Sequence, residues 1–314
     1  MHAPLVSVII PNYNHAPYLA QRFETVLFQT YQAIEIIVLD DCSTDESRRI
    51  IEQYRAYRQV VHVVYNETNS GSTFKQWLKG IELCRGEYVW IAESDDWCEP
   101  SFLETVVSGM LQKENCVVGY CQSYCMEGSN QIRWQSEHPY LSDYLTGQAF
   151  VEKYMLANTA IFNASMAVWK RESFPLISQA FTRYRMCGDW LFWIELCLHG
   201  NVFVSGKLLN YFRKHGGDVS SQSLNQGEGF TEEIALFTLL RNRKVISDRH
   251  FLLAIKHSYI RYKGAGQSLP LLTRQQLNKL FFQERPVERY LRWSYRRFYI
   301  KHSIRKVFDA IVAR

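Results

Sequence analysis

Short apolar runs rich in β-branched residues alternate with stretches of helical periodicity over the first 120 residues, and this alternation constrains the fold most. Strand-like runs fall at residues 6–10, 35–39, 60–65 and 88–92, and stretches with helical spacing fall between them at 18–30, 43–57 and 73–84. Strands joined through helices form parallel sheets, because a parallel neighbour is reached only through a crossover connection. The sequence therefore predicts an α/β protein with a mostly parallel sheet flanked by helices.

Three local signals set the expected bounds of these elements. Pro11 cannot donate to a central ladder, so we expect the first strand to end there. Ser43 and Glu46 have capping-box spacing, which predicts a helix that begins at Ser43. Another helix should begin near Pro100, since proline suits a first helical turn. Each expected strand therefore ends in a polar loop.

The pattern becomes less regular after residue 126. Residues 128–144 are polar and rich in aromatic side chains, and we interpret them as a loop or lid. Strands are expected at 164–169 and 202–211, a helix at 188–199, and mostly helices beyond 220. We therefore predict a domain at 1–220, made of the halves 1–125 and 126–220, followed by a helical C-terminal extension at 221–314.

Composition excludes several classes of protein. Of the 314 residues, 47% are apolar and 21% are charged, as in folded globular proteins. No stretch reaches the roughly 18 to 20 apolar residues of a membrane-spanning helix, and residues 1–4 lack the basic start of a signal peptide. The eight cysteines lack the paired spacing of a zinc site and are interpreted as reduced thiols. A cytoplasmic protein is expected.

Carboxylates gather where two of the expected strands end. Asp40 and Asp41 follow the second strand, and Glu93, Asp95 and Asp96 follow the fourth. Open α/β sheets bind ligands outside the carboxyl ends of their strands. Crowded carboxylates need a cation, and Mn²⁺ or Mg²⁺ binds carboxylates together with phosphates. The alternatives are an acidic turn that caps the next helix and a helix cap at Asp40 or Asp41.

Together with the polar turn after the first strand, these strand ends resemble the glycosyltransferase family 2 enzymes of GT-A fold. The resemblance covers roughly residues 5–125 and is carried by VSVIIPNYN (6–14), QTY (29–31), DDCSTD (40–45), NSG (69–71) and GEY (86–88). It implies a GT-A (Rossmann-like) sheet whose first half binds a nucleoside-diphosphate sugar and whose second half binds a saccharide or lipid-linked acceptor. The implied reaction is an inverting sugar transfer to an acceptor hydroxyl in bacterial-type surface polysaccharide or glycoconjugate synthesis.

The resemblance also implies roles for single residues in the first half. Pro11, Asn12 and Tyr13 would line the nucleoside, and Asp41 would accept a hydrogen bond from a uracil-type base, which makes the expected donor UDP-linked. Lys75 would lie near the diphosphate, although an ordinary solvated helix lysine is an equal alternative.

A metal site is implied by two further matches. Asp95 and Asp96 correspond to the family's DxD-type element, with Asp95 toward the ribose or sugar and Asp96 toward the metal. Glu93 stands where many members have Asp, and its longer side chain can still reach a ligand. The sequence YFRKH resembles a late Arg-x-His element, in which His215 meets the metal or diphosphate and Arg213 offsets phosphate charge. A lone histidine is more often structural.

The sequence CGDW at 187–190 resembles the family's short motif that holds the catalytic base, although many members have Glu-Asp where this chain has Gly-Asp. The resemblance makes Asp189 the candidate base that takes the proton of the acceptor hydroxyl. Its alternative role is the N-cap of the following helix, and the two roles are compatible.

Positive charge is concentrated at the C-terminus. Residues 285–314 hold nine Lys or Arg against two Asp or Glu, a net charge of +7 in a chain of net charge +5. Apolar residues recur there at helical spacing and leave a basic face, which suits a helix on an anionic membrane surface. The alternative is a terminal helix docked on the preceding domain with its arginines in solvent.

Three other functions explain fewer of these features. A nucleotidyltransferase-like enzyme needs a glycine-rich phosphate loop after the first strand, and residues 11–18 contain no glycine. A dinucleotide-dependent oxidoreductase needs a GxGxxG motif after a strand, and the absence of glycine from residues 11–18 rules against that motif as well. A nucleic-acid binder that uses the basic tail leaves the acidic strand ends unexplained, so nucleic acid is not an expected partner.

Overall fold

The computed structural model describes residues 3–312 apart from 129–130, 158, 216–226 and 266–267, with the backbone alone beyond residue 300. The chain forms two compact units. The first comprises Met1–Val151 and Ala160–Gly216, and the second comprises Glu152–Thr159 and Gly217–Arg314. The short segment 152–159, which the sequence placed in the first domain, therefore lies in the second unit.

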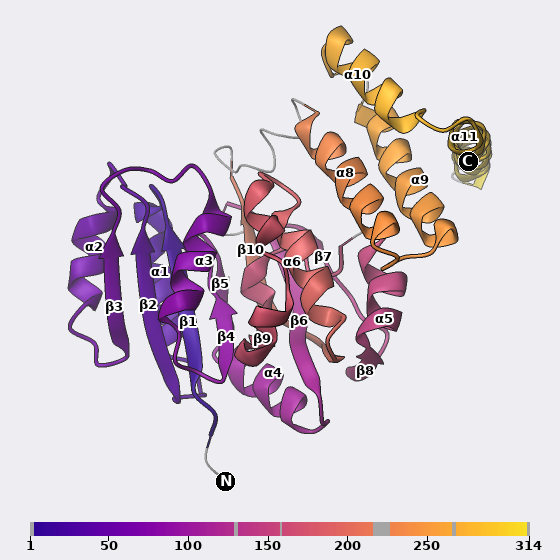
Figure 1. Ribbon diagram of the computed structural model, residues 1–314. Helices are drawn as coiled ribbons and strands as arrows, with labels where there is room; N and C mark the ends of the chain where they lie inside the picture. The colour runs from indigo at the N-terminus through magenta and orange to yellow at the C-terminus, as the bar shows by residue number, and fades with distance from the viewer. Residues whose placement is uncertain (1–2, 129–130, 158, 216–226, 266–267, 313–314) are drawn as a thin grey trace. The chain divides into compact units, whose positions relative to one another are not determined.

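One mixed sheet forms the centre of the first unit (Figure 1). Among the described residues it has ten strands, in the order β3-β2-β1-β4-β9-β6-β10-β5 with β7 beside β6 and β8 beside β10. Their bounds are β1 (Val6–Asn12), β2 (Ile34–Asp40), β3 (Val60–Tyr65), β4 (Tyr88–Ile91), β5 (Trp97–Cys98), β6 (Cys116–Glu127), β7 (Gln131–Gln135), β8 (Ser142–Thr146), β9 (Ala167–Lys170) and β10 (Asn201–Lys214). Strand β1 is parallel to β2 and β4, and β2 to β3, so their carboxyl ends meet at one edge.

Strands β1, β2 and β4 are buried along their whole length, which explains their continuous apolar runs. The predicted end of β1 is wrong by one residue, because Pro11 stays in the ladder opposite Leu39. The ladder from β1 to β4 ends at Ile9, so the missing N–H of Pro11 removes no bond on that side.

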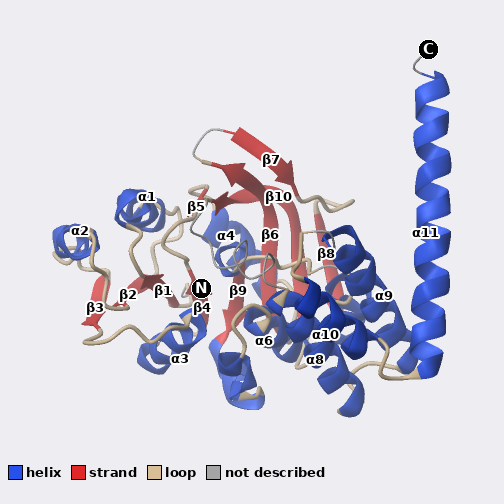
Figure 2. Cartoon of the chain, turned by 90° about the horizontal axis from the view of Figure 1, so that it is seen from above, coloured by secondary structure: helices blue, strands red, loops and turns tan. Residues whose placement is uncertain are grey.

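Helices cover both faces of this sheet. Figure 2 shows α1 and α2 on one face of β1 to β3 and α3 on the other. The helices of the first unit are α1 (Ala16–Leu27), α2 (Ser47–Tyr54), α3 (Thr73–Leu83), α4 (Phe102–Leu111), α5 (Gly147–Phe150) and α6 (Gly188–Cys197), with 3-10 turns η2 (Ala164–Met166), η3 (Arg171–Leu176) and η4 (Gln179–Arg183). A π-helical turn, η1 (Val151–Met155), follows α5. The α/β fold predicted from the sequence is confirmed.

The predicted start of α2 is wrong. Ser43 does not cap the helix, because its Oγ donates to Asp40 Oδ1 at 2.6 Å and its backbone N–H donates to Asp40 Oδ2 at 3.0 Å. Asp45 Oδ1 accepts instead from the backbone N–H of Ser47, the first helical residue, at 2.9 Å. Ser43 is therefore tied to the end of β2, and Asp45 is the residue of this turn that contacts the helix start.

Residues 128–144, expected to be a loop or lid, contain β7 and the beginning of β8. Strand β7 pairs antiparallel with β6, and β8 pairs antiparallel with β10. All five residues of β7 are exposed, so the sequence lacks the alternation that marks a strand with one buried face. The irregular segment is thus an extension of the sheet.

The described part of the second unit is mostly helical, as expected. Its helices are α8 (Glu228–Asn242), α9 (Asp248–Ala265), α10 (Leu271–Phe281) and α11 (Arg285–Val312). Their shared core consists of large apolar side chains, including Phe230, Phe237, Tyr259, Tyr262 and Phe281. Within the described part of the chain, no helix combines the length and the apolar character needed to cross a bilayer.

Candidate active site

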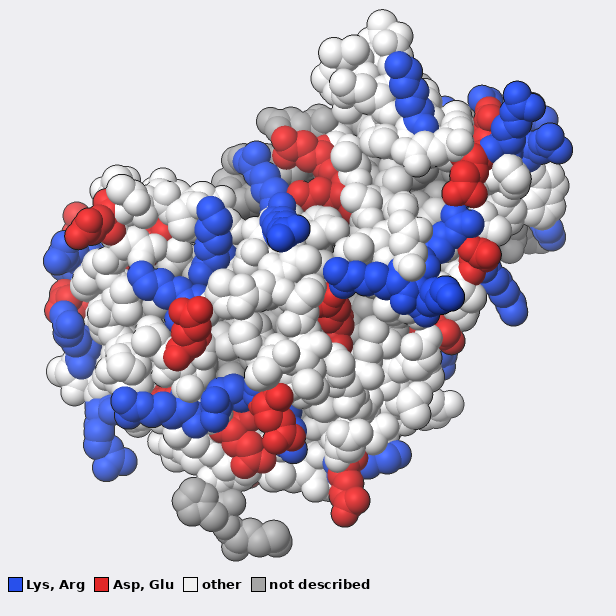
Figure 3. All heavy atoms as spheres, in the orientation of Figure 1, with Lys and Arg blue, Asp and Glu red and all other residues white. Residues whose placement is uncertain are grey.

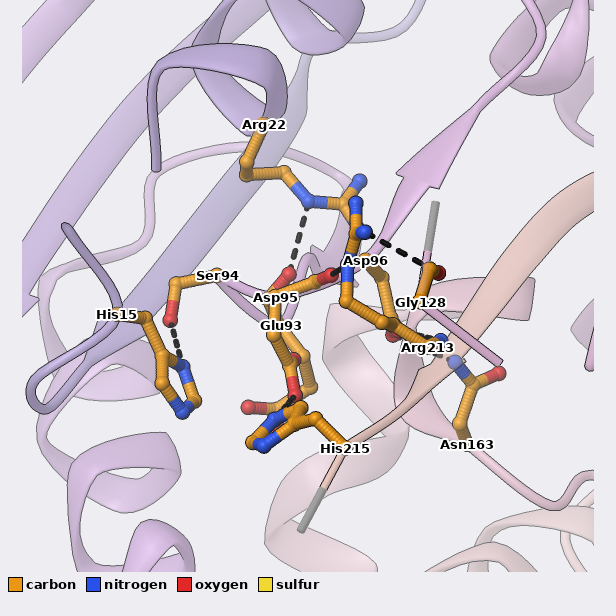
Figure 4. Close-up of polar contacts among 10 residues, drawn as sticks. All are labelled: His15, Arg22, Glu93, Ser94, Asp95, Asp96, Gly128, Asn163, Arg213 and His215. Carbon is orange, nitrogen blue, oxygen red and sulfur yellow. Dashed lines mark hydrogen bonds and ion pairs between the residues drawn. The ribbon is translucent and has the colours of Figure 1, made fainter. Parts of the chain in front are cut away.

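Residues 93–96, here called the acidic loop, connect β4 to β5 at the carboxyl edge of the sheet (Figure 4). Asp96 is only 2% exposed, and its Oδ2 accepts from Asn163 Nδ2 at 2.6 Å. Its Oδ1 accepts from the backbone N–H of Arg213 at 3.0 Å. Burial and the charge of Asp95 raise the pKa of Asp96 to about 7. Both carboxyl oxygens of Asp96 thus accept hydrogen bonds from other parts of the protein. This arrangement does not fit the expected contact between Asp96 and a metal ion.

Asp95 lies beside two histidines. Its Oδ2 is 3.1 Å from Nε2 of His215, which directly follows β10, and His15 lies between β1 and α1. One possible ligand atom from each of these three residues lies within 4.8 Å of the other two. His15 Nδ1 is 2.8 Å from Ser94 Oγ, a contact that orients the ring against the acidic loop. Figure 4 shows both imidazoles beside this loop. Imidazole nitrogens and a carboxylate oxygen at this spacing can hold a divalent ion.

His15 was not among the residues predicted from the sequence. The turn after β1 includes Asn14, whose φ of 55° lies in the left-handed region and redirects the chain into α1. This turn places His15 at the same sheet edge as the acidic loop. The available signal was its position directly after the PNYN turn of a predicted strand.

The charges in this cluster are unequally distributed. Burial lowers the pKa of His15 and outweighs the charge of Asp95, which raises it, while the nearby His215 lowers it further. Burial opposes ionisation of Asp95, but the hydrogen bond from His215 and the charges of both histidines hold its pKa below the usual range. Burial and the charge of Asp95 raise the pKa of Glu93 to about 8. Asp95 is therefore the carboxylate of the acidic loop that ionises most readily, and it is the one that lies beside the two imidazoles.

A fully buried arginine supports the acidic loop from inside the protein. Arg22 Nε donates to the backbone carbonyl of Glu93 at 2.8 Å, and its Nη2 donates to Ser165 Oγ at 3.1 Å. Ser165 Oγ also accepts from the backbone N–H of Glu93 at 3.0 Å. Figure 4 shows the Arg22 side chain reaching the loop. This fixed positive charge offsets part of the negative charge of the loop.

Arg213 also contacts the acidic loop. Its guanidinium lies 4.5 Å from the ring centroid of Tyr18 and 4.3 Å from that of Trp97. Its Nε donates to the backbone carbonyl of Asp95 at 2.8 Å, and its Nη2 donates to Gln21 Oε1 at 2.7 Å. The side chain expected to meet phosphate is thus used to hold the loop that carries Asp95.

A second polar cluster lies at the ends of β1 and β2. Asp41 is buried, and its Oδ1 accepts from Asn66 Nδ2 at 2.6 Å, from Gln76 Nε2 at 3.0 Å and from the backbone N–H of Ser70 at 2.9 Å. Its Oδ2 accepts from Ser70 Oγ at 2.7 Å. Asp41 therefore fixes the loop before α3, and Lys75 on that helix donates to the carbonyl of Ser70 at 3.2 Å.

The other residues predicted to line the nucleoside share this cluster. The backbone carbonyl of Asn12 accepts from the N–H of Asp41 at 2.8 Å, and Asn12 Nδ2 donates to Asp40 Oδ1 at 2.8 Å. Pro11 is buried in β1, whereas Tyr13 is 46% exposed and presents its ring outside the strand end. The structure thus brings Pro11, Asn12, Tyr13 and Asp41 together.

Asp189 is the second residue of α6. Its Oδ1 accepts from the backbone N–H of Trp190 at 2.7 Å, and Cys187 holds the N-cap position that the sequence offered to Asp189. The helix start packs against α3, because a Cβ at Gly188 would lie 2.5 Å from Phe74 Cε2. The same α3 helix carries Lys75, which places both predicted residues at neighbouring helix starts.

Aromatic packing links α6 to the acidic loop. Trp77 of α3 lies edge-on to Phe192 of α6, with ring centroids 5.5 Å apart. The indole N–H of Trp77 donates to Glu93 Oε1 at 2.8 Å. The Glu93 carboxylate thus points into the protein interior, where it accepts from Trp77, and not into the space between the two histidines. The carboxyl ends of β2 and β4 flank β1, about 10 Å apart at two strand spacings, so one extended ligand can reach both polar clusters.

A mixed α/β sheet with polar side chains at the carboxyl ends of its parallel strands agrees with the nucleotide-sugar-binding fold called GT-A. Residues 7–175 match the family model of glycosyl transferase family 2, which is more than half of the chain. The chain belongs to this family.

Curated relatives agree with this assignment. The chain is 35% identical to glycosyltransferase GlyG of Streptococcus pneumoniae over 56% of its length and 55% of that protein. It is 40% identical to TuaG of Bacillus subtilis, a protein named provisionally for teichuronic acid biosynthesis, over 35% of its length and 43% of that protein. The matches thus span about half the length of these relatives.

Two solved structures share the fold. Staphylococcus aureus TarS with UDP-GlcNAc has a TM-score of 0.63 at 17% identity, covering 93% of this chain and 92% of that one. The mannosyltransferase PcManGT of Pyrobaculum calidifontis with GDP-Man and Mn²⁺ has a TM-score of 0.54 at 13% identity, covering 98% of this chain and 88% of that one. The predicted GT-A fold is confirmed by these likenesses.

Proposed function

We propose that the chain is an inverting glycosyltransferase that moves a sugar from a UDP-linked donor to an acceptor hydroxyl. The observation that carries the proposal is the group formed by His15, Asp95 and His215, whose possible ligand atoms lie within 4.8 Å of one another at the carboxyl edge of the sheet. Family membership supports the reaction class, and the TarS structure with UDP-GlcNAc supports a uridine nucleotide as the donor's carrier.

The three residues would hold a divalent cation. Two imidazoles and one carboxylate suit Mn²⁺ better than Mg²⁺, because Mg²⁺ strongly prefers oxygen ligands. When bound, such an ion stabilises the negative charge that develops on the departing diphosphate. The PcManGT structure with Mn²⁺ supports a metal of this kind. In this proposal Asp95, and not Asp96, is the carboxylate ligand.

The nucleotide would lie across the ends of β2 and β1. Asp41 and Ser70 hold the loop before α3 in place, and the exposed ring of Tyr13 offers a surface for the uracil base. Asn12 fixes the end of β1 through Asp40. Lys75, at the start of α3, would offset the charge of the diphosphate. Arg213 takes no direct part, because it positions the acidic loop.

Asp189 would act as the base. As the bond between the sugar and the diphosphate breaks, the anomeric carbon becomes oxocarbenium-like and the acceptor oxygen attacks from the opposite face. Asp189 takes the proton of that hydroxyl, a contribution typically worth about 10²–10⁴-fold. A single displacement inverts the configuration at the anomeric carbon. We infer that the acceptor is a saccharide or lipid-linked saccharide of a surface polysaccharide or glycoconjugate, met in the cytoplasm or at the inner face of the membrane.

A donor-hydrolysis assay tests this proposal without knowledge of the acceptor. The full chain is incubated with UDP-sugars and GDP-sugars, with Mn²⁺ or EDTA, and the released nucleoside diphosphate is measured. We expect Mn²⁺-dependent release from a UDP-sugar, lost in Asp95→Asn and His215→Gln and retained in His199→Gln, which changes an exposed histidine beyond α6. Release that is equal with EDTA, or unchanged in Asp95→Asn, would contradict the proposed site.

Transfer to a saccharide acceptor tests the base. We expect Asp189→Asn to bind UDP and Mn²⁺ like the natural chain but to transfer sugar at least about 100-fold more slowly. Undiminished transfer in this variant would remove Asp189 from the role of base while leaving the proposed donor site intact.

A further inference from the structure

Up to residue 300, where its side chains are described, helix α11 packs on its own unit along one side. Val287, Leu291 and Ser294 are buried, and their spacing places them on one face of the helix. The ring of Tyr295, on the same side, lies 6.1 Å from that of Tyr259 in α9. The docked part of the described side chains therefore ends near Tyr295, and residues 296–300 are all exposed.

The opposite side of the helix, here called the outer face, consists of Arg289, Trp293, Arg296, Arg297 and Ile300. All five are exposed, with Trp293 at 56% and Ile300 at 59%. In the described part of the chain none of the three arginines forms an ion pair, whereas Arg292, on the side of the helix, pairs with Glu288 at 2.8 Å. The Arg297 guanidinium lies 5.4 Å from the ring centroid of Trp293. The outer face thus combines unpaired positive charge with exposed apolar area.

The figures show the reach of this face. In Figure 2, α11 continues well past α9, so that much of the helix has no neighbour among the described residues of its unit. In Figure 3, Lys and Arg spheres gather where α11 is viewed end-on. The whole segment 285–314 carries a net charge of +7, whereas the preceding residues together carry −2.

We propose that the outer face of α11 binds the surface of an anionic lipid membrane. Arginine side chains are attracted to anionic headgroups, and their long stems let the charge stay at the headgroup level while the helix approaches the lipid. Trp293 matches the amphipathic side chains that sit at membrane interfaces, and Ile300, two turns along, reaches the acyl boundary beside it. A nucleic acid would satisfy the arginines, but its phosphate backbone offers nothing to Ile300. The apolar pair therefore favours lipid.

Vesicle flotation tests the proposal with the full chain. Vesicles of phosphatidylcholine alone are compared with vesicles that also contain phosphatidylglycerol, at low and high salt. We expect binding only to the anionic vesicles, weakened by salt because the Debye length shortens. In the double variant Arg289→Gln and Arg296→Gln, the partition coefficient should fall about 25-fold, at about fivefold for each basic residue.

Two further variants separate the contributions. Trp293→Ser with Ile300→Ser should weaken binding to anionic vesicles at both salt concentrations, because it removes the apolar term. The matched control changes two exposed cations of the same unit outside α11, Arg249→Gln with Lys279→Gln, and should bind like the natural chain. Because all the changed side chains are exposed, circular dichroism melting should show that every variant is folded.

Three outcomes would overturn the proposal. The first is equal binding to neutral and anionic vesicles, and the second is an equal loss in the control and outer-face variants. The third is salt-sensitive binding of RNA or DNA fragments without any binding to vesicles, which would assign the face to nucleic acid. Donor hydrolysis measured on the same variants should be unchanged, so failure here is distinguishable from failure of the proposed enzyme activity.

Discussion

Asp95 and Asp96 are adjacent in sequence but have different environments, and this difference organises the candidate site. Asp96 turns inward to Asn163 and the Arg213 backbone, and its pKa is raised to about 7 by burial and by Asp95. Asp95 faces His215, and its pKa is held low against the effect of burial by the histidines. A motif of two acidic residues therefore divides into a proposed metal ligand, Asp95, and a structural residue, Asp96.

This division predicts opposite phenotypes for two matched substitutions. Asp95→Asn should lower Mn²⁺ affinity by more than the about 10–100-fold that an outer-shell group costs, with little change in stability. Asp96→Asn should keep Mn²⁺ affinity but lower stability by about 1–3 kcal/mol, because its new amide meets the amide donor of Asn163. Calorimetric Mn²⁺ titration and urea unfolding measure the two effects. If Asp96→Asn lost Mn²⁺ as completely as Asp95→Asn, the proposed division into ligand and structural residue would be contradicted.

The cysteines test, residue by residue, which side chains are buried in the folded chain. Burial raises the pKa of Cys84 to about 12 and those of Cys98 and Cys116 to about 11, from an ordinary value of 9.0. Because the folded-state pKa values are the higher ones, the neutral thiols favour the folded state below pH 9 and this contribution is lost as the pH rises toward 11 to 12. Cys42 is partly exposed.

We therefore expect one fast thiol near neutral pH. Brief alkylation followed by mass spectrometry should label Cys42 first, with the buried cysteines labelled only after denaturation. The Cys42→Ser variant serves as the control and should show no fast phase. Labelling of Cys98 at the rate of Cys42 would contradict the described burial.

At the scale of the element, β2 and β4 could be predicted because they are buried along their whole length, and the partly exposed strand β3 could be predicted from its run of valines. The runs at 35–39, 60–65 and 88–92 agree with β2, β3 and β4 to within one residue. Strand β7 could not be predicted, because its exposed residues have no buried face to impose a pattern. The role of Arg22 could not be predicted either, because a fully buried arginine in a helix is rare and the sequence gives no sign of its burial.

The candidate site, like the strands, could be predicted only in part. Short motifs identified Asp95 and His215, but His15 has no motif of its own, and its place depends on the turn at Asn14. The inward orientation of Asp96 and the loop-holding contacts of Arg213 depend on partners distant in sequence, such as Asn163 and Gln21. Pairings of that kind follow from the folded backbone and not from spacing along the chain.

The packing of α4 on the sheet gives an element-scale prediction. A Cβ at Gly109 would lie 2.2 Å from the ring of Phe203 in β10, which is buried. Gly109→Ala should therefore destabilise the chain by about 1–3 kcal/mol, because the helix or the ring must move. Ser108→Ala, at the exposed neighbouring position of the same helix, should change stability by less than about 0.5 kcal/mol. Urea unfolding distinguishes them, and equal stability of the two variants would contradict the tight contact.

At the scale of the whole molecule, the sheet and the candidate site lie in the first unit, whereas the basic helix lies in the second. The proposed donor chemistry and the proposed membrane binding are thus assigned to different parts of one chain. Each can be removed by substitution without touching residues of the other.

Ligand binding should be visible as a rise in the melting temperature of the unit that holds the candidate site, measured on the full chain. UDP with Mn²⁺ at about 100 times the dissociation constant contributes about 2.7 kcal/mol, which for a unit of this size raises Tm by roughly 5–10 °C. Differential scanning fluorimetry should show this rise in the natural chain and in Asp189→Asn. EDTA, or the Asp95→Asn substitution, should abolish it. A rise that persists in EDTA would show that the nucleotide binds without the metal.

Arg22 has a further consequence for how the enzyme would pass through repeated rounds of catalysis. A guanidinium keeps its proton at every physiological pH, so the acidic loop carries a permanent internal counterion whichever ligands come and go. Exchange of the proposed metal ion would then act on Asp95, the carboxylate beside the two histidines. We expect the acidic loop to keep its shape between the departure of the product and the arrival of the next donor. No rearrangement of the loop would then delay the next turnover.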